Sequence, residues 1–362
     1  MRLSCEVEAF SSGEHLSQFF TGLGLLSKAG ELSFTQIRNK NYASGVLGRP
    51  FVKLLLGNGE RIAIDLSDSD SIDEQQLASV DRYYKRCLLP EFADGERVFP
   101  YGLNYACYGP GMGWMKRVLW SVMADRDSLK RNALLQMARH VTPIAKLIGV
   151  DKGRRSSDFR FFEGKPIDSE NPEIIFFTRA WSPDRNGLPS KLVSERKEMN
   201  KMRAECIRRL RRNFGEVFRG GFEAEEYALA NFPDCVVREK DVTLKRNYIQ
   251  NMKRASICIS TTGLQGSTPW KLGEYVAGAK AIVSEPVRHV LPGDFARGEN
   301  YFEFNSPDEC VNAVGRLVEE KSTRLAMMKR NKDYYSQYLR PDKLVRNMLD
   351  GQVRGAIPSR GV

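Results

Sequence analysis

The chain has 362 residues, a formal net charge of +11, 41% hydrophobic residues and 10% aromatic residues. This length predicts two domains with separate cores, and the composition excludes disordered and low-complexity architectures. No apolar run approaches the roughly 20 residues of a membrane-spanning helix, and acidic residues interrupt the N-terminal stretch, so we expect a cytoplasmic protein.

The seven cysteines are scattered and never spaced as Cys-x-x-Cys. This pattern is typical neither of a disulfide framework nor of a structural zinc site, so we expect buried thiols. The Asp68-Ser69-Asp70 spacing is the one that could suggest a divalent ion, but it lies among serines in the first half. We therefore expect no metal site.

The positive charge is concentrated in two segments. Residues 113–165 carry twelve Lys or Arg against five Asp or Glu, and residues 191–219 carry ten against four. Such a distribution favours an anionic partner. Nucleic acid is not expected, because the chain contains no helix-turn-helix, RRM, KH or zinc signature and no aromatic stacking pattern.

The first half alternates strands with helices. Apolar runs predict strands, and apolar residues at three-and-four spacing predict an amphipathic helix over residues 14–28. The predicted strands cover residues 3–10, 32–37, 52–56, 62–66 and 97–101. This order favours a mostly parallel α/β sheet.

Residues 109–165 lack that alternation and are interpreted as an insertion or linker. Trp114 and Trp120 lie close in sequence to Lys116 and Arg117, a combination that suits a helix on an anionic membrane surface. The alternative is a helix that packs its aromatic residues into a core and exposes its charges.

The second half predicts another Rossmann-like domain. Its expected elements are a strand at 172–179, a helix at 191–213, short segments at 217–219 and 235–238, a helix at 248–254, a strand at 256–261, a helix at 269–278, a strand at 281–284 and a helical stretch at 307–349. The arginines of the helix at 191–213 are expected to form a solvated face.

Residues 260–285 are the most informative window. A strand leads into a loop rich in Gly, Ser and Thr, and a helix begins at Pro269. The loop N–H groups and the helix N-terminus would form a cradle for a diphosphate. Lys271 and Glu274 lie three residues apart, so a cation could meet phosphate while a carboxylate accepts ribose hydroxyls. An ordinary strand-loop-helix-strand crossover is the alternative.

This window resembles the donor-binding half of GT-B glycosyltransferases, in which a Ser/Thr-rich loop precedes a helix carrying a basic residue, a Glu and Ala-x-Gly. Residues 291–309 are similar to the corresponding segment of bacterial group 1 enzymes. The resemblance is good over roughly 172–349. It is weaker in the first half, where residues 64–69 and 80–86 look similar to acceptor domains of bacterial surface-polysaccharide glycosyltransferases.

The resemblance implies an α/β fold of GT-B architecture, with two Rossmann-like domains facing an interdomain cleft. Residues 1–165 would form the acceptor-binding domain, including the insertion at 109–165. Residues 166–349 would form the donor-binding domain, and 350–362 a C-terminal tail.

The resemblance also implies a nucleotide-diphospho sugar as donor substrate, with no further cofactor. Glu274 would bind the ribose. The residues expected at the donor diphosphate are Arg179, with Arg185 as a weaker candidate, Lys245, Thr262, Gly263, Gly266, Ser267, Thr268 and Lys271. Gly266 stands where many retaining members have a first Glu, so the stereochemical outcome stays open.

An inverting reaction needs a base to take the proton of the acceptor hydroxyl. His15 lies between the first strand and the first helix, and it resembles the Gly-His step of many inverting GT-B enzymes. Asp65 and Asp68 could orient an imidazolium, and Glu14 is a rival base. A solvated, helix-capping role for this turn is the alternative.

These features predict glycosyl transfer to a glycan or lipid-linked acceptor in bacterial cell-surface polysaccharide synthesis, as for lipopolysaccharide, capsule or O-antigen. The expected location is the inner face of the cytoplasmic membrane, with peripheral contact to anionic lipid. The alternatives are a GT-B nucleotide-sugar epimerase and an inactive glycan-binding relative.

Overall fold

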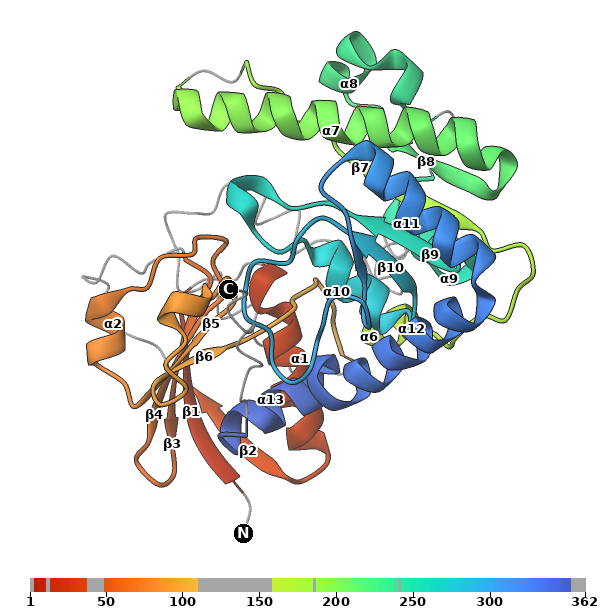
Figure 1. The fold of residues 1–362 in the computed structure, drawn as a ribbon. Helices are drawn as coiled ribbons and strands as arrows, with labels where there is room; N and C mark the ends of the chain where they lie inside the picture. The colour runs from red at the N-terminus through yellow and green to blue at the C-terminus, as the bar shows by residue number, and fades with distance from the viewer. Residues whose placement is uncertain are drawn as a thin grey trace, which may run out of the picture. The chain divides into compact units, whose positions relative to one another are not determined.

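The computed structural model describes residues 3–10, 14–37, 49–109, 158–184, 187–237, 239 and 242–352 (Figure 1). The chain divides into two compact units. Unit 1 comprises Met1–Phe161, His289–Asp294 and Ser336–Val362, and unit 2 comprises Phe162–Arg288 and Phe295–Tyr335. The prediction of two α/β units is confirmed, while the cleft between them stays a prediction.

Unit 1 contains a six-stranded sheet of order β2-β1-β3-β4-β5-β6. Its strands are β1 (Leu3–Ala9), β2 (Leu32–Gln36), β3 (Phe51–Leu56), β4 (Arg61–Asp65), β5 (Arg82–Lys85) and β6 (Val98–Pro100). Five strands run in the same direction, and β3 is antiparallel to both of its neighbours. The carboxyl ends of β1, β4 and β5 therefore meet at one edge of the sheet.

The sheet is mostly parallel, as we predict, and the antiparallel β3 is its exception. Only four residues separate Leu56 from Arg61, and the Leu56 N–H donates to the Glu60 carbonyl at 2.9 Å. A connection this short can only form a hairpin, because a parallel pair needs a crossover of a dozen or more residues. Gly59 has a φ of +90°, which glycine adopts without strain.

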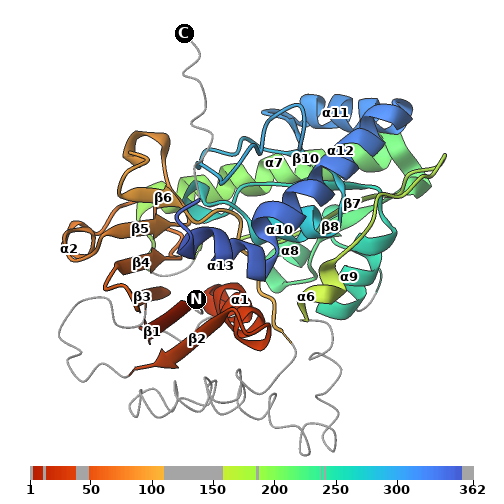
Figure 2. The ribbon, with the colours of Figure 1, turned by 90° about the horizontal axis from the view of Figure 1, so that it is seen from below.

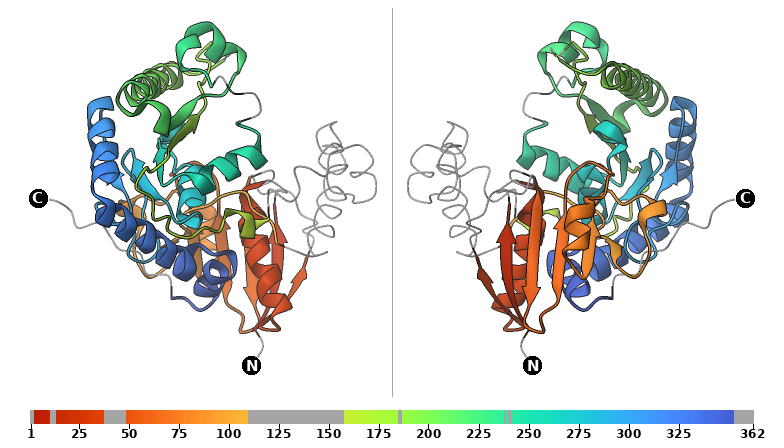
Figure 3. Two further views of the ribbon diagram at one scale, coloured as in Figure 1. Left: turned by 90° about the vertical axis from the view of Figure 1, so that its right-hand side faces the viewer. Right: turned by 90° about the vertical axis from the view of Figure 1, so that its left-hand side faces the viewer.

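Two helices from opposite ends of the sequence cover one face of this sheet (Figures 2 and 3). They are α1 (Ser17–Lys28), which follows a 3₁₀ turn at Glu14–Leu16, and α13 (Pro341–Leu349). Their apolar side chains share one core with the strands. The approach is close enough that a Cβ on Gly22 would overlap the Pro341 carbonyl oxygen.

Residues 336–352 therefore belong to unit 1, although we predict residues up to 349 to lie in the donor domain. Arg82 and Tyr84 of β5 reinforce this placement, since both donate to the Met348 carbonyl, at 2.6 and 3.0 Å. These bonds satisfy carbonyls in the last turn of α13, which have no partner within the helix. Burial of the apolar face of α13 against α1 is the physical reason for the difference.

Unit 2 contains a wholly parallel sheet of order β11-β10-β9-β7-β8. Its strands are β7 (Ile174–Thr178), β8 (Phe218–Phe222), β9 (Ile257–Ser260), β10 (Ala281–Ser284) and β11 (Phe302–Glu303). Numbered within the unit, the order is 2-1-3-4-5, a doubly wound pattern in which the direction of winding reverses between β7 and β9.

The remaining described helices are α2 (Glu74–Ala78) in unit 1, α6 (Phe159–Phe162) at the boundary between the units, and α7 (Ser190–Phe214), α8 (Glu226–Asn231), α9 (Lys245–Arg254), α10 (Trp270–Ala277), α11 (Pro307–Glu319) and α12 (Lys321–Tyr334) in unit 2.

Helices lie on both faces of the sheet of unit 2. The helices α7, α11 and α12 share a core with alternate strand residues such as Ile257 and Ile259. The opposite face meets α9, where the rings of Phe177 and Tyr248 pack edge to face. The long helical prediction at 307–349 is interrupted at Tyr335–Leu339, a short π-helical turn.

All seven cysteines lie in described parts of the chain and are free and buried, as expected. Within the described ranges no helix is long and apolar enough to cross a membrane. Of the segment 109–165 that we predict to contact a membrane, residues 110–157, including Trp114 and Trp120, lie outside the described residues.

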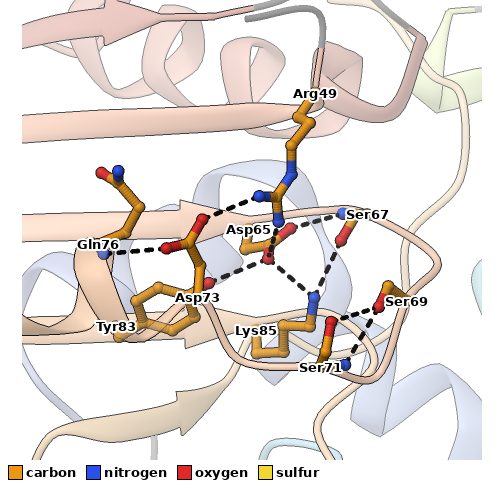
Figure 4. A network of polar contacts seen from close by, with 9 residues as sticks. All are labelled: Arg49, Asp65, Ser67, Ser69, Ser71, Asp73, Gln76, Tyr83 and Lys85. Carbon is orange, nitrogen blue, oxygen red and sulfur yellow. Dashed lines mark hydrogen bonds and ion pairs between the residues drawn. The ribbon is translucent and has the colours of Figure 1, made fainter. Parts of the chain in front are cut away.

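A buried ion pair organises the carboxyl end of β4 (Figure 4). Asp65 and Lys85 are both fully buried, and the Lys85 ammonium donates to Asp65 Oδ2 at 2.8 Å. The same oxygen accepts from Tyr83 at 3.0 Å and Arg49 at 3.4 Å, while Oδ1 accepts from the Ser67 N–H at 3.0 Å. Burial alone would raise the pKa of Asp65, but the charge of Lys85 and its hydrogen bond lower it. Both charges are thus compensated by protein groups.

We expect Asp65→Asn to lower the free energy of unfolding by about 3–5 kcal/mol, because it leaves the Lys85 charge buried and uncompensated. Urea denaturation measures this loss. The control Ser67→Ala, which removes one hydrogen bond to Lys85, should cost only about 1 kcal/mol. In the wild type, the pKa of Asp65 is lowered in the folded state. The ion pair therefore contributes its full stability above the usual pKa range of Asp, and this contribution is lost as the pH falls through the folded-state pKa. Equal losses in the two variants would contradict this account.

Candidate functional site

The strand order of unit 2 reverses between β7 and β9. At this point the loop after β7 and the loop after β9 lie together at the carboxyl edge of the sheet. Ligands of doubly wound folds bind at such a point. Arg203 of α7 contacts both loops and is 4% exposed. Its guanidinium donates to the Arg179 carbonyl at 2.8 Å, to Thr261 Oγ1 at 3.0 Å and to the Thr262 carbonyl at 2.8 Å. Burial lowers the pKa of Arg203 to about 10.

Two more polar residues of α7 hold the loop after β7. Asn200 accepts from the Trp181 N–H at 2.9 Å and donates to its carbonyl at 2.8 Å, and Arg196 donates to the Ser182 carbonyl at 2.7 Å. Sequence reasoning missed this face, although Arg196, Asn200 and Arg203 follow one another at spacings of four and three.

The basic face expected on α7 is engaged within unit 2. Arg208 pairs with Asp234 at 2.6 Å and Glu205 at 2.7 Å, and Arg209 pairs with Asp308. Arg211 donates to backbone carbonyls, including that of Gly220 at 2.8 Å. The face is therefore partly exposed to solvent, as expected, and much of its charge is also paired within unit 2.

The loop after β9 is compact and closes on itself. The Gly263 N–H donates to the Ser267 carbonyl at 2.8 Å, and a Cβ on Gly263 would overlap the Ser267 hydroxyl. Ser267 and Thr268 are each 5% exposed, and Gly266 has a φ of +68°. The glycines that we predict to belong to an anion cradle are therefore required by the loop geometry itself.

Two carboxylates already occupy donors of this loop. Glu285, which follows β10, accepts from the Thr262 N–H at 2.7 Å and from its hydroxyl at 2.9 Å. Glu195 of α7 accepts from the Gln265 N–H at 2.5 Å. Sequence reasoning assigned no role to either residue, and an acid directly after a buried strand is the signal that could have found Glu285.

The candidates Lys245, Lys271 and Glu274 come together around Tyr248 of α9. Glu274 is 3% exposed, accepts from Tyr248 at 2.7 Å and pairs with Lys245. The Lys271 ammonium donates to the Phe177 carbonyl at 2.5 Å and lies 4.7 Å from the centre of the Tyr248 ring. Burial lowers the pKa of Lys271 to about 8, against an opposing effect of Glu274. Tyr248 was missed, because nothing in its local sequence distinguishes it from a core residue.

Arg179 lies at the end of β7, as expected. It pairs with Glu223 at 2.8 Å and with Glu225 at 3.4 Å, and its side chain is half-exposed. The hydrogen bond to Glu223 raises the pKa of Arg179, so the guanidinium stays charged. The weaker candidate Arg185 lies outside the described residues.

In unit 1, His15 and Asp68 meet at the carboxyl edge of the sheet. His15 Nε2 lies 3.7 Å from Asp68 Oδ2, and Arg86 pairs with the other oxygen of Asp68. Burial alone would raise the pKa of Asp68, but the hydrogen bond with His15 and the charge of Arg86 lower it to about 2. Asp68 is therefore an anion at neutral pH.

The two other candidates near His15 are arranged differently. Asp65 is committed to Lys85, Tyr83 and Arg49. Glu14 has an exposed side chain, and its carbonyl accepts from the Ser17 hydroxyl at 2.6 Å. Asn104 donates to the His15 carbonyl at 2.9 Å and fixes the backbone of this turn. No group of three or more potential metal-ligating side chains occurs in the part of the chain that the structure describes.

No family model and no curated protein matches the chain. Solved structures that resemble it include glycosyltransferases and nucleotide-sugar epimerases. The C-terminal domain of a group 1 glycosyl transferase, LpcC from Francisella tularensis, is 10% identical, with 49% of this chain and 96% of that chain covered and a TM-score of 0.35. An alpha1,3-fucosyltransferase is 12% identical, with coverage of 97% and 89% and a TM-score of 0.41. A UDP-N-acetylglucosamine 2-epimerase from Listeria monocytogenes, named as putative, is 8% identical, with coverage of 96% and 95% and a TM-score of 0.37.

We expect Arg203→Lys to loosen the two loops at the reversal point, because an ammonium cannot reach three acceptors that a planar guanidinium spans. Hydrogen exchange should accelerate at residues 261–268, and the free energy of unfolding should fall by about 1–3 kcal/mol. The matched control is Arg212→Lys, an exposed arginine of the same helix, which should change neither. Unchanged exchange in Arg203→Lys would show that the loops are held by other contacts.

Proposed function

We propose that the chain transfers a glycosyl group from a nucleotide-diphospho sugar to a glycan or lipid-linked acceptor. The observation that carries this proposal is the pair of loops after β7 and β9, joined by Arg203 at the reversal point of a parallel sheet. A ligand with a diphosphate and a nucleoside suits this place, because the N-terminus of α10 attracts anions.

The ribose of the donor would lie against Glu274. Each carboxylate oxygen of Glu274 already takes part in one interaction, with Tyr248 or with Lys245. Since each carboxylate oxygen has more than one acceptor site, both can still accept a ribose hydroxyl. Lys245 and Tyr248 would then hold Glu274 in place while it binds.

The base would be His15, positioned by Asp68. With Nε2 turned toward Asp68, Nδ1 is the nitrogen that would take the proton of the acceptor hydroxyl. The acceptor oxygen forms a bond to the anomeric carbon while the bond from that carbon to the nucleoside diphosphate breaks. Asp68 would stabilise the imidazolium that forms, because its lowered pKa keeps it ionised.

The acceptor and its setting rest on the sequence. The resemblance to bacterial surface-polysaccharide enzymes supports a cell-surface glycan pathway, and the basic, Trp-containing residues 109–165 support contact with an anionic membrane on its cytoplasmic side. The alternatives are a nucleotide-sugar epimerase and an inactive glycan-binding relative. Two experiments distinguish them from glycosyl transfer.

A panel of UDP- and GDP-sugars should raise the melting temperature for at least one nucleotide, because a ligand that binds only the folded state stabilises it. The same donor should release nucleoside diphosphate when a suitable acceptor is present. Absence of any thermal shift across the panel would refute nucleotide-sugar binding. Conversion of the donor sugar without transfer would point to the epimerase.

With an active donor and acceptor pair, we expect His15→Ala and Asp68→Asn to lower kcat by about 10²-fold or more, because both act on the proton of the acceptor. The KM for the donor should change little, since neither residue belongs to unit 2. Glu14→Gln is the matched control. A larger loss in Glu14→Gln than in His15→Ala would transfer the role of base to Glu14.

A further inference from the structure

The contact between His15 and Asp68 joins two surface segments of unit 1. Their side chains are 29% and 50% exposed, and Asp68 lies in the loop that follows β4 rather than in the sheet. Holding an exposed carboxylate in one direction costs side-chain entropy, and the attraction between exposed charges is weak in water. The pairing with His15 therefore needs a rigid group that fixes Asp68 from the protein side.

Arg86 is that group. It directly follows β5 and is 2% exposed, and its backbone N–H donates to the Asp65 carbonyl at 2.9 Å, so its position is set by the sheet. Its guanidinium pairs with Asp68 Oδ1, whereas His15 faces Asp68 Oδ2. Because the two partners take different oxygens, the contact with Arg86 directs the second oxygen toward the imidazole.

Arg86 also changes the effect of Asp68 on the charge of His15. A carboxylate beside an imidazole favours the protonated ring. A general base must be neutral before it accepts a proton, so an Asp68 without a counter-charge would oppose the proposed role of His15. The pair of Asp68 and Arg86 has no net charge. Asp68 can therefore orient the ring while Arg86 limits the tendency of the ring to stay protonated.

Other titratable groups near this turn do not replace Arg86. Glu14 carries the opposite charge, and its side chain is exposed. Near the same turn lie two phenols whose pKa is raised by burial, a buried thiol, and an ion pair that is compensated internally: Tyr101, Tyr108, Cys107, and Asp65 with Lys85. Within the described part of unit 1, Arg86 is therefore the cation that pairs with Asp68.

We infer that Arg86 is a positioning residue of the transfer reaction. It holds Asp68 against His15 and offsets the charge of Asp68, which leaves His15 available as the base. The inference rests on the proposed function for the identity of the reaction. The arrangement of the three side chains does not depend on that function and can be measured without substrate.

A histidine-selective NMR titration of the full chain tests this arrangement. The chain has three histidines, and the signal that is absent from His15→Ala belongs to His15. Arg86→Gln should raise the midpoint of the His15 titration by about half a pH unit or more, because it removes a unit charge a short distance from the ring. Asp68→Asn should lower the midpoint by a similar amount, since Arg86 then acts on the ring without its counter-charge.

The double variant with Asp68→Asn and Arg86→Gln should titrate close to the wild type, because the pair that it removes has no net charge. It leaves neither group without its partner, so it carries the test where a single variant does not fold. The matched control is Arg82→Gln. Arg82 lies at the start of the same strand, is 9% exposed and pairs with Glu60 at 2.5 Å, so its loss should lower stability without moving the His15 midpoint.

With an active donor and acceptor pair, the pH profile gives a second readout. In Arg86→Gln the acid limb of kcat should move to higher pH, so that kcat falls by about 3-fold or more on that limb, the factor that half a pH unit represents. Part of this loss should be recovered at higher pH, where His15 is neutral again. The KM for the donor should change little, since Arg86 belongs to unit 1. Arg86→Lys keeps the charge and should restore most of the wild-type profile.

The outcomes separate this inference from the proposed function. An unchanged His15 midpoint in Arg86→Gln, or an equal shift in Arg82→Gln, would overturn the inference. A double variant that titrates well below the wild type would also overturn it, because Arg86 would then contribute nothing to the charge of His15. A loss of kcat in Arg86→Gln that is equal at all pH values would show a structural role instead. Midpoints that shift as expected in a wild type that transfers no sugar would overturn the proposed function and leave the coupling of the three side chains intact.

Discussion

One buried guanidinium holds the candidate donor site together. Arg203 donates to acceptors on two loops that lie far apart in the sequence, and its planar group fixes the directions of all three hydrogen bonds. Burial opposes its charge and lowers its pKa to about 10, and the charge of Glu285 offsets part of that effect. The positions of Arg179 and Thr262 at the reversal point therefore depend on Arg203 of α7, which is distant in the sequence from the ends of both strands.

The same constraint, that a buried charge needs a partner, explains the arrangement of the other candidates. Glu274 is buried and is held by Lys245 and Tyr248, and Asp65 is buried against Lys85. The charge of each carboxylate is therefore compensated within the protein.

Elements defined by short-range pattern were predicted well. The apolar run at Ile174–Thr178 and the loop leading into α10 lie where the sequence places them, because periodicity and helix-terminal residues act over a few positions. The mostly parallel sheet of unit 1 was predicted, but the antiparallel direction of β3 was not specified, although the four-residue turn before Arg61 carries the information for a hairpin. The assignment of α13 to unit 1 could not be predicted from the sequence pattern, because an apolar helix face can pack on either core. Its contacts with α1 and β5 decide between the two units.

The sequence by itself determined the two α/β units, the glycine-rich loop with its following helix, and a candidate His15 at the end of the first strand. Only the tertiary structure decided that Asp68 rather than Asp65 faces His15, that Glu285 occupies the Thr262 donors and that Arg203 joins the two loops. The physical reason is range: helix starts and strand runs depend on neighbours along the chain, whereas the partner of a charge depends on which strand ends the sheet topology brings to the same edge.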